Sequence, residues 1–100
     1  MDFAVDALYD RGFSDSNGHP EPKSLRYQYS RVEDAVARFN RESRDPGIVR
    51  VKLLSRRSPS SGFSVYAVAD GPSSLDAETV SAAFRGRDFI QMTLEVRYAN

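Results

Sequence analysis

The chain has 100 residues, of which 40% are hydrophobic and 28% charged, with no net charge and no cysteine. This length predicts one domain spanning residues 1–100, and the composition excludes an intrinsically disordered chain. The lack of cysteine excludes disulfides, thiolate nucleophiles and thiolate metal ligands. No run approaches the roughly 20 apolar residues of a membrane-spanning helix, and the N-terminal residues lack a signal-peptide pattern. We therefore expect a cytoplasmic protein without a membrane partner.

Residues 2–9 fit two kinds of secondary structure. In a strand, one apolar face would alternate with a mixed face, with Phe3, Val5, Ala7 and Tyr9 opposite Asp2, Ala4, Asp6 and Leu8. In a helix, Phe3, Ala4, Ala7 and Leu8 would share one side. The similarity between FAVDALYDRG and the later FSVYAVADG slightly favours the strand. Residues 10–24 are rich in Gly, Pro, Ser and Asp, which predicts a mobile loop.

A strand, a helix and two further strands are predicted next. Residues 25–29 alternate in polarity, which indicates a half-buried strand. Ser30 and Glu33 have the spacing of a capping box. The apolar stripe of the helix that follows is Val32, Ala35, Val36 and Phe39. Pro46 ends this helix, and strands are predicted over residues 48–54 and 63–69 around the turn RRSPSSG.

The C-terminal part predicts a helix over residues 75–85 and a strand over 89–98. Asp76 and Glu78 in the first helical turn complement the helix dipole. After residue 24 the order is strand, helix, strand, strand, helix, strand. This order predicts an α+β fold, a ferredoxin-like βαββαβ sandwich with an antiparallel sheet and two helices on one face. The N-terminal segment would add an edge strand or a short helix, and the strand over 48–54 would lie at a sheet edge.

Charge is unevenly distributed along the chain, with net −4 over residues 1–22, +6 over 23–57 and −2 over 58–100. Assigning the more apolar side of each strand to the helices leaves a sheet face, here called the open face, that is mostly basic. The Arg56-Arg57 turn would extend this face. We predict that a partner binds these residues: Arg26, Arg50, Lys52, Leu54, Arg56, Arg57, Tyr66 and Arg97.

Residues that carry catalytic or metal chemistry are scarce. His19 is the single histidine, and it lies in a loop without neighbouring cysteines or clustered carboxylates. The chain also lacks the glycine motifs that bind phosphates and the G-x-S-x-G motif of hydrolases. We therefore expect no metal, no cofactor and no enzymatic activity.

The expected function is that of a small non-catalytic binding protein, an accessory factor or inhibitor acting on a protein or ribonucleoprotein partner. Proteins of this size class include those carried by phages and mobile elements. A first alternative is single-stranded nucleic-acid binding by the same surface, because sheet platforms bind such strands through aromatic stacking and basic loops. A second alternative is a small enzyme or a homodimeric ligand-binding domain of the same fold, in which two copies pair through a sheet face or edge.

Overall fold

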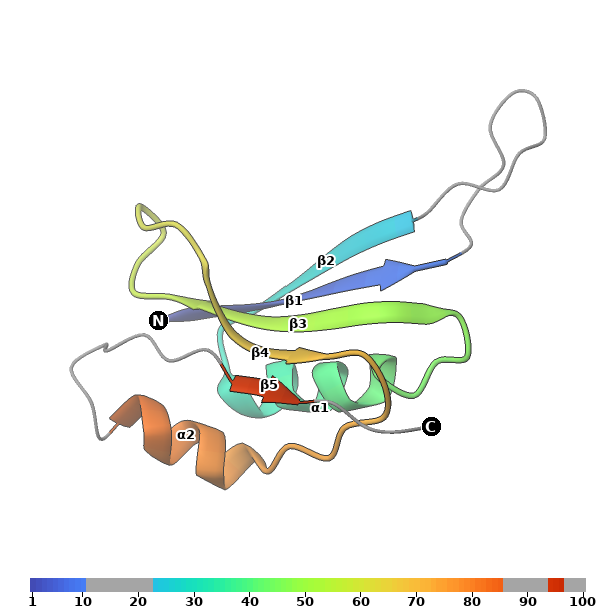
Figure 1. The fold of residues 1–100 in the computed structure, drawn as a ribbon. Coiled ribbons are helices and arrows are strands. Elements are labelled where there is room, and N and C mark those ends of the chain that lie inside the picture. The colour runs from blue at the N-terminus through green and yellow to red at the C-terminus, as the bar shows by residue number, and fades with distance from the viewer. Residues whose placement is uncertain (11–22, 86–93, 97–100) are drawn as a thin grey trace.

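The computed structural model describes residues 1–10, 23–85 and 94–96, and it forms an α+β fold (Figure 1). Its elements are β1 (Asp2–Tyr9), β2 (Lys23–Tyr29), α1 (Val32–Glu42), β3 (Ile48–Arg56), β4 (Ser64–Ala69), α2 (Ala77–Arg85) and β5 (Leu94–Val96). The strands make one sheet in the order β2-β1-β3-β4-β5, and both helices cover the same face. The first four strands pair antiparallel, but β4 and β5 are parallel, so the prediction of a wholly antiparallel sheet is wrong at this edge. Most of the predicted loop 10–24 and of the predicted strand 89–98 lies outside the described residues.

The position of β1 differs from the prediction and changes the topology. β1 is a strand that pairs antiparallel with both β2 and β3, so it lies inside the sheet rather than at its edge or across the core. β3 is consequently the central strand, and its predicted edge position is wrong. A ferredoxin-like sandwich would place β2 inside the sheet. Here β2 is an edge strand paired with β1 alone, and β4 pairs directly with β5, which leaves no place for β2 between them.

The core lies between the sheet and the two helices. The alternation of β1 buries Phe3, Val5 and Ala7 on the helix side, as the strand pattern predicted. The apolar stripe of α1 packs on them and is almost fully buried, with residues Val32, Ala35, Val36 and Phe39. β3 adds Val51 and Leu53, β4 adds Ala67 and Ala69, and α2 adds Val80. Burial of this apolar surface is the main favourable contribution to folding.

The helix starts differ in how they are capped. Arg31 occupies the N-cap of α1 and makes no side-chain capping bond, so the predicted capping box of Ser30 and Glu33 is wrong. At α2, the backbone N–H and the hydroxyl of Thr79 both donate to Asp76 Oδ2, at 3.0 and 2.8 Å. Asp76 is therefore the N-cap residue rather than part of the first turn. These bonds, led by that of the hydroxyl, hold the pKa of Asp76 below its ordinary value.

At two register shifts in the sheet, residues face the side opposite to the one that simple alternation predicts. Between Leu53 and Leu54 the pairing passes from Ala67 to Val65, which leaves Tyr66 as an extra residue in a β-bulge. A second shift, between Leu8 and Tyr9, leaves Val49 without a cross-strand partner. Val49 is 44% exposed, although the alternation of its strand placed it in the core.

Hydrogen bonds from two polar side chains hold the end of α1 against the segment that leads into α2. Asn40 Nδ2 donates to the carbonyl of Leu75, and the N–H of Leu75 donates to Asn40 Oδ1, both at 2.9 Å. The N–H of Ser73 donates to Ser43 Oγ at 2.8 Å. These bonds satisfy backbone groups of a segment that has no regular secondary structure.

Candidate binding surfaces

The open face of the sheet carries most of the residues that the sequence singled out. Arg26 on β2 and Arg50, Lys52, Leu54 and Arg56 on β3 lie on the side opposite the helices. Their places follow from the pairing of Arg26 and Lys52 with Asp6, of Arg50 with Leu8, and of Leu54 with Ala4. The loop between β3 and β4 rises on this same side of the sheet (Figure 1).

Three of the cations on the open face are neutralised within the molecule. Arg26 forms a two-bond ion pair with Asp6, with Nε to Oδ1 at 2.6 Å and Nη2 to Oδ2 at 2.7 Å. Arg56 Nε lies 3.0 Å from Asp2 Oδ2, and Arg50 Nε lies 2.9 Å from Asp70 Oδ1. Because β1 brings two carboxylates between β2 and β3, the face is mixed in charge rather than basic.

Phe63 joins the two arginines that flank β1. The guanidinium Cζ of Arg56 lies 4.4 Å from the centre of the Phe63 ring, and that of Arg26 lies 5.1 Å from it. Such cation–π contacts contribute about 0.5–1 kcal/mol each at exposed sites. The ring therefore lies over β1, which explains why Ala4 and Leu54 are 0% and 5% exposed on a face that no helix covers. Leu54 supports this small apolar cluster and offers a partner little surface.

The other predicted residues lie elsewhere. Tyr66 faces the helices and not the open face, since its ring packs 4.9 Å from the ring of Phe84 on α2. Phe84 in turn contacts Phe3 at 5.4 Å. The bulge is the physical reason, because the extra residue turns Tyr66 to the side of Leu53. Arg57 is exposed on the β3–β4 loop, and Arg97 lies outside the described residues.

Lys52 differs from the arginines around it. Within the described part of the chain its ammonium group makes no ion pair, although Asp6 lies opposite it on β1. It lines a small pocket of about 190 Å³ on the open face, together with Asp6, Ala7, Leu8, Ser24 and Arg50. Leu8 is 37% exposed beside it. An unpaired cation next to an exposed apolar side chain suits a partner that presents a carboxylate and an apolar group.

Sequence reasoning missed four residues of this face, which are Asp2, Asp6, Asp70 and Phe63. The alternation of residues 2–9 placed Asp2 and Asp6 on one side of a strand, but nothing in the sequence placed that strand between β2 and β3. Phe63 was assigned to the apolar side of β4, and its contacts depend on the path of the β3–β4 loop. For Asp2 and Asp6 the sequence signal was the alternation of polar and apolar residues over 2–9. For Phe63 the sequence held no such signal.

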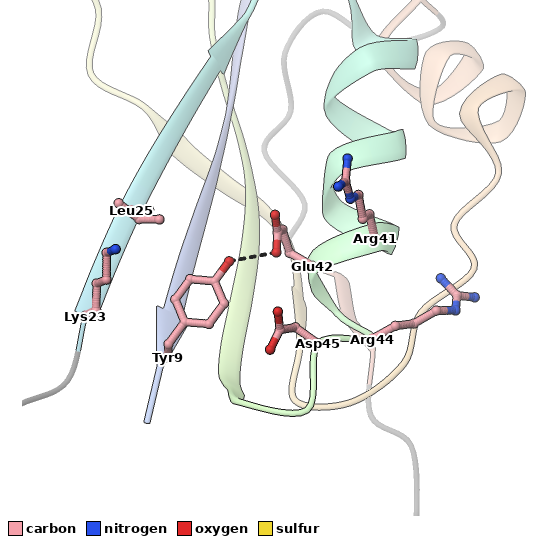
Figure 2. Close-up of a pocket in the computed structure, with 7 residues that line it drawn as sticks. All are labelled: Tyr9, Lys23, Leu25, Arg41, Glu42, Arg44 and Asp45. Carbon is pink, nitrogen blue, oxygen red and sulfur yellow. Dashed lines mark hydrogen bonds between the residues drawn. The ribbon is translucent and has the colours of Figure 1, made fainter. Parts of the chain in front are cut away.

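A second and larger pocket of about 470 Å³ lies on the helix side, where the end of α1 meets β1 and β2 (Figure 2). It is lined by Tyr9, Lys23, Leu25, Arg41, Glu42, Arg44 and Asp45. The hydroxyl of Tyr9 donates to Glu42 Oε2 at 2.7 Å. Burial, together with this bond to a carboxylate, raises the pKa of Tyr9.

Comparisons with protein-family models, with curated proteins and with solved structures found no match to this chain. In the part of the chain that the structure describes, no group of three or more His, Cys, Asp or Glu residues lies together as metal ligands would. Neither helix there has the length and apolar character needed to cross a membrane.

Proposed function

We propose that the protein is a small non-catalytic binding protein, an accessory factor or inhibitor that recognises a protein or ribonucleoprotein partner through the open face. The single observation that supports this most is the pocket of about 190 Å³ in which Lys52 and Leu8 meet. It offers one available positive charge beside apolar surface, and the arginines that the structure describes on the same face are paired. The partner would place an acidic side chain against Lys52 and an apolar one against Leu8.

The pairing of charges favours a protein partner over direct nucleic-acid binding. Among the residues of the face whose side chains the structure describes, four cations oppose three carboxylates, which are Asp2, Asp6 and Asp70. Nucleic-acid affinity depends on cations that neutralise phosphates and release counterions. Three arginines would first have to leave their carboxylates, which lowers the gain from each phosphate. In addition, Tyr66 packs against α2, so it is not a stacking platform on this face.

The test is site-specific photocrosslinking in cells of the source organism. A benzophenone amino acid replaces Leu8, which is 37% exposed on the open face. The matched control carries it at Ala37, an exposed residue on the outer side of α1. We expect a discrete product with one protein from position 8, and no such product from position 37.

A charge reversal at Lys52 makes the test specific for the pocket. Lys52→Glu should abolish the product from position 8, whereas Arg31→Glu, at the far end of α1, should leave it unchanged. Equal products from positions 8 and 37, or a product that survives Lys52→Glu, would overturn the proposal. A product with twice the mass of the chain would also overturn it, because the face would then join two copies.

A further inference from the structure

The pocket on the helix side has the size of a small-molecule site and mostly charged walls, and it is independent of the open face. Its volume of about 470 Å³ lies within the range of roughly 300–1,000 Å³ that is typical of ligand pockets. Tyr9 and Leu25 supply apolar surface from β1 and β2. Charged side chains enter from both β2 and α1, as Figure 2 shows.

The floor of this pocket is fixed and locally neutral. Glu42 is 7% exposed and accepts two bonds, one from the Tyr9 hydroxyl at 2.7 Å and one from Arg38 Nη1 at 3.0 Å. Arg38 Nε also donates to the Tyr29 hydroxyl at 2.8 Å, and its guanidinium stacks 4.2 Å from the ring of Tyr27. The negative charge of Glu42 is thus balanced by Arg38, and the Tyr9 ring is held in place.

The rim is cationic. Arg41 is exposed, and its guanidinium makes no hydrogen bond or ion pair with the residues that the structure describes. Lys23 lies across the pocket from it, on β2 (Figure 2). Asp45 and Arg44 also line the pocket and make hydrogen bonds of their own. Asp45 Oδ1 accepts the N–H of Gly47 at 2.8 Å, and Arg44 donates to the Asn40 carbonyl and to Ser74 Oγ, at 2.8 and 2.6 Å.

We propose that this pocket binds an organic phosphate monoester with a flat apolar body. The phosphate would lie between Lys23 and Arg41, where two cations match its two negative charges. The apolar body would pack against the Tyr9 ring and Leu25. Because the floor is held by Glu42 and Arg38, binding requires little rearrangement of the site, which limits its entropic cost.

Three probes separate the parts of this ligand, and each is titrated into the labelled protein and followed by NMR. Phenyl phosphate carries both the charge and the ring, inorganic phosphate only the charge, and benzyl alcohol only the ring. We expect phenyl phosphate to bind with a dissociation constant of about 1 mM or tighter and to shift the amide signals of Tyr9, Lys23 and Arg41. The other two probes should bind at least about tenfold more weakly, because each lacks one set of contacts.

Charge-removing variants locate the phosphate. Lys23→Gln and Arg41→Gln should each weaken phenyl phosphate about tenfold, since each removes a hydrogen bond between charged groups. Arg31→Gln, an exposed arginine at the other end of α1, should bind as the unmodified chain does. No saturable binding of phenyl phosphate would overturn the proposal. So would equal affinity for inorganic phosphate, or binding that both variants leave unchanged.

Discussion

The ion pair of Arg26 and Asp6 is the feature of the open face that mutation can measure most cleanly. The two side chains make bonds of 2.6 and 2.7 Å but remain 44% and 27% exposed. Solvent therefore screens their attraction, and a double-mutant cycle should give a coupling energy of about 0.5–1 kcal/mol, at the upper end for surface pairs. The cycle uses Arg26→Gln, Asp6→Asn and the double variant, each unfolded with urea. The contact of Arg26 with Phe63 is lost whenever Arg26 is replaced, so it cancels from the coupling.

The pair of Arg31 and Glu33 provides the control cycle. Its closest approach is 3.6 Å, with side chains 72% and 54% exposed, so we expect a coupling near zero. In about 1 M salt, where the Debye length is roughly 3 Å, the coupling of Arg26 and Asp6 should decrease. A coupling between Arg26 and Asp6 that is no larger than that of the control would refute the view that the open face neutralises its own cations.

Three further predictions concern the fold and the charge balance. Asn40→Ala should lower the free energy of unfolding by about 1–3 kcal/mol, because two bonds to Leu75 are lost. Asn40→Asp, which keeps the acceptor, should lower the free energy of unfolding less. Equal losses for the two variants in urea unfolding would contradict the role of the hydrogen bonds between Asn40 and Leu75. The raised pKa of Tyr9 means that the unfolded chain loses this proton first, so folding stability should fall as the pH rises above the ordinary value of 10.0. The stability deficit of Tyr9→Phe should therefore shrink between pH 9 and 11 in urea unfolding, and a constant deficit would refute the assignment. Asp2→Asn with Asp6→Asn should release two arginines and steepen the salt dependence of RNA binding by about 1.4 in log–log slope, measured by fluorescence anisotropy. An unchanged slope would contradict the pairing.

Local sequence patterns predicted most helices and strands. The order of the strands in the sheet depends on long-range pairing, which local patterns do not contain. The stripe of α1 and the alternation of the strands depend on neighbouring residues, and they predicted both helices, the strands β2, β3 and β4, and the α+β class. Residues 2–9 were left open between strand and helix, and of the predicted strand 89–98 the structure describes only residues 94–96. The place of β1 depends on partners far along the chain, such as the pair of Asp2 and Arg56, which are 54 residues apart. No local pattern contains that information, so the ferredoxin-like order did not follow from the correct elements.

The candidate site was predicted in part for the same reasons. Arg26, Arg50, Lys52 and Leu54 were assigned to the correct face because residues 25–29 and 50–54 alternate without interruption. Arg56 was predicted in the turn, but it is the last residue of β3 and lies on the same face. Tyr66 was misplaced because a bulge adds one residue to β4, and one added residue reverses the facing of its neighbours. The basic character of the face was overestimated because the acidic β1 was not known to cross it.

The salt dependence of nucleic-acid binding tests most directly whether the open face is a mixed-charge protein surface. Labelled random single-stranded RNA and DNA would be titrated with the protein from about 20 to 300 mM salt. With Arg26, Arg50 and Arg56 paired to carboxylates, we expect dissociation constants weaker than about 100 µM at physiological salt and a log–log slope no steeper than about −1. A dissociation constant of about 1 µM with a slope of −3 or steeper would contradict the account. The face would then bind nucleic acid, and Arg56 and Arg57 would be the first residues to replace.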